Sequence, residues 1–153
     1  MSLLTEIDNG FKTALKNQDR VKLSTLRMLK AALKNRQVQE KRALAEAEVV
    51  AVITSQVKQR RESIMEFTRA GRSELAQKEK EELEFLLSFL PQQLTVEELR
   101  QELTAIMREL GVTGPGDLGK VMKIAMPKFA GRADGKEVNR LVKQLLEEVA
   151  PHS

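Results

Sequence analysis

The chain lacks cysteine, tryptophan and tyrosine, and its single histidine, His152, lies one residue from the C-terminus. Without cysteine it forms no disulfide and has no thiolate nucleophile or thiolate metal ligand. One histidine cannot build a multi-histidine metal site, and at the chain end it is poorly placed to serve as a catalytic base. We therefore expect no catalytic residue, no metal and no cofactor.

Long apolar runs are also missing. No stretch approaches the ~18 apolar residues that a membrane-spanning helix needs. The N-terminal stretch Met1–Glu6 (MSLLTE) lacks the basic flank and apolar core of a secretory signal. From these features we expect a cytoplasmic protein with no membrane partner.

Proline occurs four times and aromatic residues make up only 3% of the 153 residues, whereas 41% are hydrophobic and 31% charged. The common residues are helix formers, and β-branched residues never alternate with polar ones in the period-two pattern of a strand. The composition therefore favours an all-α protein with a modest core.

In the N-terminal part, capping residues and apolar spacing predict about four helices. Ser2 and Asp19 are suited to cap the first two, and Gly71 is suited to end a third that begins near Glu46. A fourth helix is predicted from a Ser73 cap to Pro91, because proline disfavours helical geometry in the residue before it. Its predicted core positions are Leu75, Leu83, Leu86, Leu87 and Leu90. The first helix is predicted to bury Leu4, Ile7, Phe11 and Leu15.

Pro91–Leu94 is the best candidate for a domain boundary. Beyond it, Thr95–Glu98 and Asp134–Glu137 have the pattern of capping boxes that open helices, and a short helix between them is predicted to stop near Pro127. We therefore predict an N-terminal helical subdomain over residues 1–90 and a three-helix C-terminal subdomain over residues 95–150.

Two patterns resemble catalytic motifs without meeting their requirements. Gly114–Lys120 (GPGDLGK) matches the spacing of a phosphate-binding loop, but a helix is predicted before it and Val121 stands where a magnesium-binding Ser or Thr is needed. The acidic stretch Glu81–Glu84 is interpreted as a solvated helix face and not as a catalytic carboxylate pair.

The basic residues are concentrated in two segments. From Arg20 to Arg42 there are eight basic residues and one acid, and four of the basic residues share a helix face as a secondary candidate surface: Arg27, Lys30, Lys34 and Lys41. From Gly119 to Lys143 there are seven basic residues and two acids. These seven are the candidate RNA-binding residues: Lys120, Lys123, Lys128, Arg132, Lys136, Arg140 and Lys143.

A basic surface attracts nucleic-acid phosphates through Coulomb attraction and counterion release, although an ordinary solvated helix face has the same appearance in a sequence. Single-strand binders stack bases on aromatic side chains, and this chain has few of these. We expect any RNA ligand to be a folded one, read through its backbone and shape, with Gly119 and Gly131 permitting close approach.

Several stretches resemble the YqeY family in order and spacing. They are LRMLKAA (26–32), VKQRRES (57–63), FTRAGR (67–72), LPQQL (90–94), GKVM (119–122) and GRADGKEVN (131–139). The last two also resemble the tail of GatB, a subunit of the glutamine-dependent amidotransferase that acts on mischarged tRNA. The resemblance implies a two-part helical fold and a link to tRNA, while the catalytic domains of that enzyme have no counterpart here.

Three functions remain open from the sequence. The preferred one is a non-catalytic module that binds tRNA or another folded RNA, alone or with translation-related proteins. The second is a protein-interaction adaptor whose helical grooves receive a partner. The third is an amidotransferase, a carbon–nitrogen ligase with glutamine as amide donor, which the resemblance implies but for which no catalytic group is found.

Overall fold

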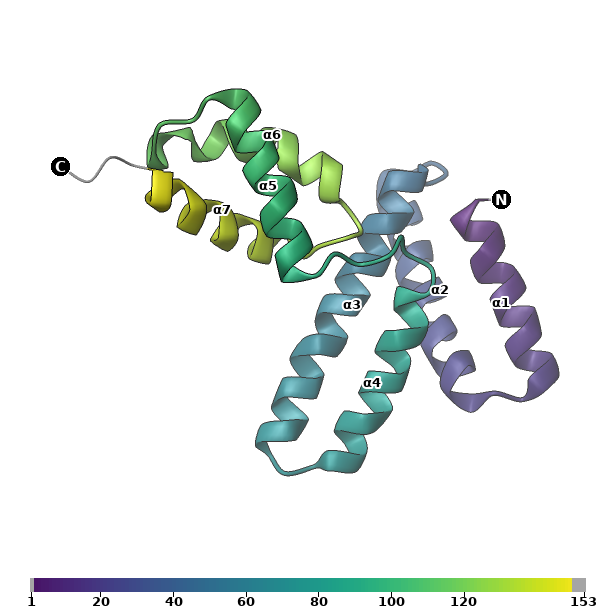
Figure 1. The fold of residues 1–153 in the computed structure, drawn as a ribbon. Helices are drawn as coiled ribbons and strands as arrows, with labels where there is room; N and C mark the ends of the chain where they lie inside the picture. Colours follow the sequence, from purple (N-terminus) through teal and green to yellow (C-terminus); the bar gives the residue numbers. More distant parts are fainter. Residues whose placement is uncertain (1, 150–153) are drawn as a thin grey trace. The chain divides into compact units, whose positions relative to one another are not determined.

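The computed structural model describes residues 2–149, and within this range the chain forms seven α-helices, one short 3-10 helix and no strand (Figure 1). The all-α prediction is confirmed. His152 and Ala150, the predicted end of the C-terminal subdomain, lie outside the described residues. The elements are α1 (Leu3–Asn17), α2 (Arg20–Glu40), α3 (Glu46–Arg69), α4 (Ser73–Leu87), α5 (Val96–Leu110), η1 (Pro115–Asp117), α6 (Leu118–Phe129) and α7 (Gly135–Val149).

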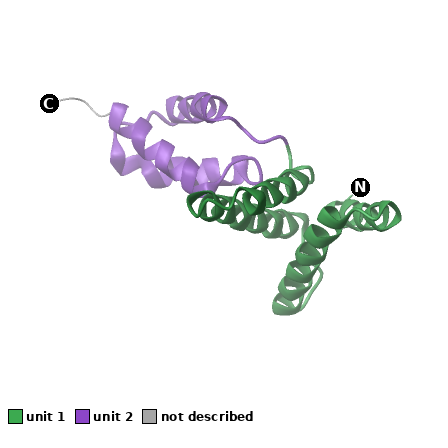
Figure 2. Cartoon of the chain, turned by 90° about the horizontal axis from the view of Figure 1, so that it is seen from below, with its two compact units in different colours: residues 1–91 green, residues 92–153 purple. Residues whose placement is uncertain are grey.

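By its internal contacts the chain divides into two compact units, Met1–Pro91 and Gln92–Ser153 (Figure 2). Each has its own apolar core. In the first unit the core includes Ile7, Leu26, Leu29, Ile53 and Leu86. In the second it includes Leu103, Val121, Phe129, Leu141 and Leu146. The division into subdomains over residues 1–90 and 95–150 stays a prediction.

Local capping chemistry explains most helix ends in the first unit. The Ser2 hydroxyl accepts a hydrogen bond from the Thr5 amide at 3.2 Å, and the Asp19 carboxylate accepts one from the Lys22 amide at 3.1 Å. Both caps were predicted. Gly71, which follows the end of α3, has a φ of +71°. Glycine adopts this left-handed backbone conformation without strain.

The fourth helix differs from the prediction at both ends. Ser73 is its first helical residue and not its cap, since Arg72 holds the N-cap position without a side-chain hydrogen bond. The helix ends at Leu87, and the amides of Phe89 and Leu90 then bond to carbonyls only three residues back. This tighter winding fits the steric demand of Pro91, which disfavours α geometry just before it.

Three predicted core leucines lie at the surface. Leu4 is 39% exposed, Leu15 is 48% exposed and Leu75 is 40% exposed. In α4 the small Ala76 is buried instead. Helical spacing alone gives the apolar face of a helix, but which end of that face is covered depends on where the neighbouring helices stop.

In the second unit, α5, α6 and α7 pack around one core. The Thr95 hydroxyl accepts from the Glu98 amide at 3.1 Å, as predicted, and α5 ends at Gly111 with a φ of +64°. The next helix, α6, predicted to stop near Pro127, ends two residues beyond it, at Phe129. A proline in the last turn removes only one hydrogen bond of the helix, and the buried Phe129 ring holds that turn against the core.

The segment that begins the second unit is tied to the loop before α7. The Leu94 amide donates to the Arg132 carbonyl at 2.9 Å, and the Gln93 side-chain amide donates to the Gly131 carbonyl at 2.5 Å. The Arg132 guanidinium in turn donates to the Gln92 carbonyl at 3.4 Å. These bonds tie residues 92–94 to the second unit.

Candidate nucleic-acid interface

The last helix presents three cations of the candidate surface to solvent. α7 buries Val138, Leu141, Val142, Leu145 and Leu146. Lys136, Arg140 and Lys143 lie on its other side and are all exposed, which is where helical spacing places them. The apolar face of α7 therefore fixes the direction in which these three side chains leave the helix.

The start of α7 is not the capping box that the sequence predicts. The Asp134 carboxylate accepts from the Lys136 amide at 2.9 Å, one residue earlier than in a capping box. The Glu137 carboxylate accepts hydrogen bonds from the Arg140 guanidinium, one turn further along the helix. This contact raises the pKa of Arg140, which stays charged, and the Glu137 carboxylate partly compensates that charge. Arg140 is therefore less available to a phosphate than its exposure suggests.

Three further candidates also have intramolecular partners. Lys120 pairs with Asp117 at 3.7 Å, and Lys128 pairs with Glu102 of α5 at 3.3 Å. Arg132 is half-buried and engaged with the Gln92 carbonyl. At 3.7 Å and with the lysine 75% exposed, the Lys120 pair is weak and easily exchanged for a phosphate.

Lys123, Lys136 and Lys143 are exposed, and their ammonium groups make no ion pair within residues 2–149. One lies on α6 and two lie on α7, and these two helices pack against each other. The structure thus separates the seven candidates into three with free charges and four with a partner inside the chain.

The two glycines assigned to close backbone approach differ. Gly119 is exposed in the first turn of α6, and a methyl group added there meets no atom within 4 Å. Gly131 is buried and has a φ of +78°. The turn between α6 and α7 requires a left-handed conformation at this position, which explains why it is a glycine. Because Gly131 is buried, the expectation that it exposes backbone to a ligand is wrong.

The stretch Gly114–Lys120 forms a capped turn. It follows α5, and the Asp117 carboxylate accepts from the Thr113 amide at 2.8 Å. That hydrogen bond is the main cause that lowers the pKa of Asp117. Since a helix precedes the stretch, the strand that a phosphate-binding loop requires is missing from this part of the described chain.

The secondary basic face on α2 is less uniform than its spacing suggests. Lys30 pairs with Asp8 of α1 at 3.2 Å and also lies 4.6 Å from the centre of the Phe11 ring. Lys41 follows the helix in a left-handed conformation, so the helical projection does not apply to it. Arg27 and Lys34 are exposed on the helix itself.

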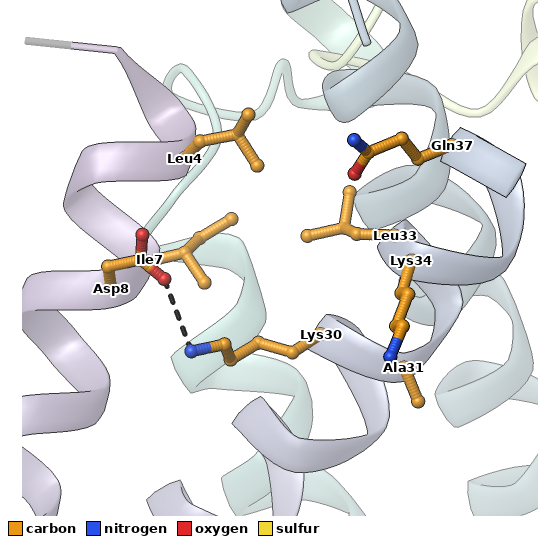
Figure 3. A pocket seen from close by; sticks show the side chains of 8 residues that line it. All are labelled: Leu4, Ile7, Asp8, Lys30, Ala31, Leu33, Lys34 and Gln37. Atoms are coloured by element: carbon orange, nitrogen blue, oxygen red, sulfur yellow. Dashed lines mark ion pairs between the residues drawn. The ribbon is translucent and has the colours of Figure 1, made fainter. Parts of the chain in front are cut away.

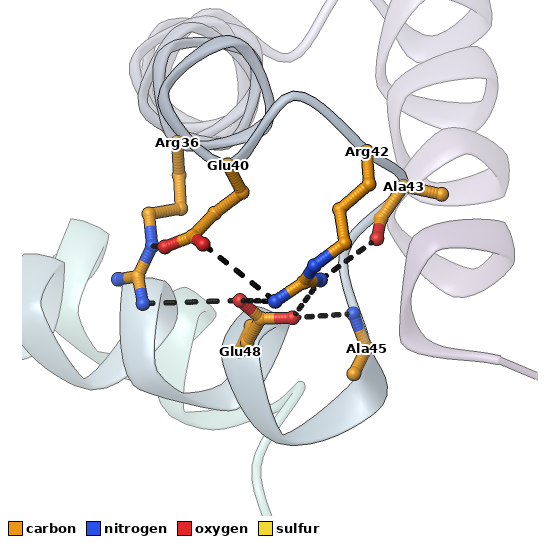
Figure 4. A network of polar contacts seen from close by, with 6 residues as sticks. All are labelled: Arg36, Glu40, Arg42, Ala43, Ala45 and Glu48. Atoms are coloured by element: carbon orange, nitrogen blue, oxygen red, sulfur yellow. Dashed lines mark hydrogen bonds and ion pairs between the residues drawn. The ribbon is translucent and has the colours of Figure 1, made fainter.

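A polar network, which was not predicted from the sequence, joins the end of α2 to the start of α3 (Figure 4). The Glu48 carboxylate accepts from the Arg42 guanidinium at 2.6 and 3.0 Å and from the Ala45 amide at 2.9 Å. Arg36 and Glu40 extend it, paired at 3.0 Å. The hydrogen bonds from Arg42 lower the pKa of Glu48 to about 2. A Glu at the third position of a helix is the signal that could have predicted the bond to Ala45.

A second network lies inside the first unit. Arg60 of α3 pairs with Glu79 at 3.2 Å and with Glu82 at 3.3 Å, both on α4. Glu82 is only 3% exposed, so the prediction that the stretch Glu81–Glu84 is a solvated face is wrong for this residue. The sequence signal was present: Arg60 stands between Val57 and Ile64 in the apolar stripe of α3.

Within residues 2–149 no cluster of three or more His, Cys, Asp or Glu side chains is placed to hold a metal ion. None of the helices in the same range is both long and apolar enough to cross a bilayer.

Residues 4–146, which include most of both units, match the sequence profile of a family described as YqeY-like protein. The chain belongs to the YqeY-like family. The resemblance found in the sequence is thereby confirmed.

Three fungal relatives of this YqeY-like chain carry the name "Altered inheritance of mitochondria protein 41, mitochondrial". The protein from Pyrenophora tritici-repentis is 27% identical over 94% of this chain and 81% of its own length. The protein from Eremothecium gossypii is 30% identical over 83% of this chain and 72% of its own length. The protein from Candida glabrata is 25% identical over 74% of this chain and 65% of its own length.

Proposed function

We propose that this YqeY-like protein is a non-catalytic module that binds tRNA or another folded RNA through α6 and the exposed face of α7. The observation that carries the proposal is a set of three exposed ammonium groups that make no ion pair within residues 2–149, on two helices that pack together: Lys123, Lys136 and Lys143. When an unpaired lysine contacts a phosphate, counterions bound to the RNA are released, and this release favours binding. A lysine in an ion pair must first break its contact with the carboxylate.

Charge segregation within the second unit supports the same surface. Residues 92–149 contain nine basic and nine acidic residues, so the net charge of this part of the chain is zero. The segment Gly119–Lys143 nevertheless has seven basic residues and two acids. The excess acid lies in α5 and in the last turn of α7. This polarity orients a polyanion toward one part of the unit and away from another.

The aromatic residues support a folded RNA over a single strand. None of the five phenylalanines is exposed, and Phe129 is 1% exposed in the core. Base stacking on Phe, the usual mode for single strands, has no platform on the described surface. Binding would therefore rest on backbone phosphates and on the shape of a helix or loop. The similarity of residues 119–122 and 131–139 to the GatB tail points to tRNA as the first ligand to test.

The direct test compares tRNA binding by the wild type and by the triple variant Lys123→Gln, Lys136→Gln, Lys143→Gln at salt concentrations between about 50 and 200 mM. The matched control replaces three exposed lysines of the first unit, Lys16, Lys78 and Lys80, with Gln. If all three candidate lysines meet phosphates, the log–log salt slope falls by roughly 2 to 3 units only in the first variant. Equal affinity and slope in both variants would favour the adaptor function instead.

We also propose a cytoplasmic location. The relatives' names place those proteins in mitochondria, and fractionation of the cells that produce this chain distinguishes the two compartments.

A further inference from the structure

The first unit carries a hollow between α1 and α2 that the RNA proposal does not use. Leu4 and Ile7 of α1 point toward Leu33 of α2 across it (Figure 3). Lys30 and Lys34 stand on its α2 side, and the hollow has a volume of about 480 Å³. We call this hollow the α1–α2 groove.

The groove continues toward the end of α2. A neighbouring hollow of about 390 Å³ shares Lys34 and Gln37 with it and is further lined by Val38, Lys41 and Arg42. From Lys30 to Val38 the groove follows α2 for about 12 Å, roughly two turns of a helix, and Lys41 stands just beyond the helix end. Val38 is 66% exposed, although it is as apolar as the buried positions of the same helix. Leu4, Ala31 and Val38 are the exposed apolar residues of this floor, and the buried Ile7 and Leu33 lie beneath it. Three exposed apolar residues along one groove differ from the single surface leucine that needs no explanation.

The charges around this floor are mostly of one sign. Lys34 and Lys41 are exposed and make no ion pair within residues 2–149, while Arg42 is paired with Glu48 and Lys30 with Asp8. Asp8 is the one acid that lines the groove. The first unit as a whole, over residues 2–91, has seventeen basic residues against thirteen acids.

An apolar floor with a basic rim is complementary to a helix that has apolar residues on one face and acids beside them. A second copy of this chain does not meet that description, since a symmetric contact would place Lys34 and Lys41 against the same lysines. A bare polyanion such as RNA would leave the exposed Leu4 and Val38 uncovered. We propose that the α1–α2 groove binds an acidic amphipathic helix of a partner protein.

This proposal is independent of RNA binding, because the two surfaces lie on different units and have no residue in common. In it, the exposed Leu4 and Val38 supply the apolar contact, and Lys34 and Lys41 select for acidic side chains. Rim charges act mainly on the rate of association and on the choice of partner, and apolar anchors act mainly on affinity. The two sets of residues therefore predict two different responses to substitution.

The experiment uses the full chain and two displayed libraries of peptides of about 16 residues, roughly four turns of a helix. Both libraries fix leucine with helical spacing. One fills the flanking positions with Asp and Glu, and the other fills them with Lys and Arg. The expected result is that the chain enriches peptides from the acidic library and none from the basic one. Equal recovery from both, or no enrichment at all, overturns the proposal.

Peptides recovered from the acidic library are then measured against variants. Leu4→Gln is expected to weaken binding about tenfold, as for loss of one apolar anchor. Lys34→Glu with Lys41→Glu is expected to weaken it at least about fivefold and more at low salt. The controls are Leu15→Gln, an exposed leucine on the same helix, and Lys80→Glu on α4. Equal weakening by the controls overturns the assignment of the groove.

Two other occupants give distinct results. If the wild type forms dimers in sedimentation and Leu4→Gln makes it monomeric, the groove holds a second copy of the chain. If Lys34→Glu with Lys41→Glu abolishes tRNA binding while the acidic peptides bind as before, the rim serves RNA. Either result contradicts the proposal. Circular dichroism of each variant verifies that it is folded, and all the substituted positions are exposed in the structure.

Discussion

The buried cation Arg60 gives the sharpest test of how the first unit is held together. Its guanidinium pairs with Glu79 and Glu82, and its second terminal nitrogen lies 3.1 Å from the Met28 sulfur. Arg60 and Glu82 are 8% and 3% exposed. Arg60→Met keeps much of the volume but leaves the Glu82 carboxylate buried without a cation. Breaking a buried pair from one side costs about 3 to 5 kcal/mol, and we expect the lower end, because Glu82 can take up a proton.

The reverse substitution is expected to be milder. In Glu82→Gln the guanidinium keeps Glu79 as its partner, so the free energy of unfolding falls by about 1 to 2 kcal/mol. Arg60→Met combined with Glu82→Leu removes both charges and should recover most of the loss, since an apolar pair of similar volume often replaces a buried ion pair without penalty. We therefore expect Arg60→Met to be the least stable of the three variants.

The pH dependence of this loss has a defined sign. Burial raises the pKa of Glu82 and Arg60 opposes that rise. A carboxyl with a raised pKa in the folded state favours folding while it is protonated, and that contribution is lost as the pH rises through the folded pKa. Without Arg60 the pKa rises further, so Arg60→Met should be less destabilising at about pH 5 than at about pH 8.

The assay is urea unfolding followed by far-ultraviolet circular dichroism, because the chain has no tryptophan to report by fluorescence. A loss below about 1 kcal/mol in Arg60→Met would show that the pair is not buried as described. An equal loss at both pH values would refute the reasoning on Glu82.

Three further predictions follow from single features. Because Arg42 lowers the pKa of Glu48 to about 2, the stabilisation from Glu48 is present above its ordinary pKa and is lost as the pH falls toward 2. Glu48→Gln should therefore unfold at a higher pH in an acid titration followed by circular dichroism, and an unchanged midpoint would contradict this. Gly111→Ala, at a φ of +64°, should destabilise by about 1 kcal/mol, whereas Gly119→Ala should stabilise α6 by about 0.5 to 1 kcal/mol in urea melts. If both changed stability in the same direction, the conformations assigned to these glycines would be wrong. Limited proteolysis should cut first near Pro91 and yield two protected fragments, and rapid loss of either fragment would argue against independently folded parts.

The fold was predictable to the extent that local chemistry decides it. Ser2, Asp19 and Thr95 cap helices in the structure as their position before apolar stripes indicates, and Gly71 and Gly111 end helices because each needs a left-handed conformation. These features depend on a few neighbouring residues and survive in any tertiary context.

The features that could not be predicted from the sequence depend on tertiary packing. Pro127 stays in α6 because Phe129 is held by the core, and no local pattern shows that. Glu82 is buried because Arg60, twenty-two residues earlier, faces it from α3. Such pairs require knowledge of which helices meet.

The candidate RNA-binding surface was likewise predictable in part. Helical spacing predicts that Lys136, Arg140 and Lys143 share an exposed face, and they do. It does not reveal that Arg140 is engaged by Glu137 or that Lys128 reaches Glu102 on another helix. Only the structure singles out Lys123, Lys136 and Lys143 as the candidates whose charges have no ion-pair partner among the described residues.

The proposal of RNA binding through these three residues is tested most directly by lysine footprinting. The chain is acetylated briefly with and without tRNA, and the modification of each lysine is measured by mass spectrometry. RNA binding through α6 and α7 predicts that Lys123, Lys136 and Lys143 lose reactivity when tRNA is present, while the exposed Lys16 and Lys80 of the first unit keep theirs. Unchanged reactivity at the three lysines, or protection centred on Lys34 and Lys41, would contradict it.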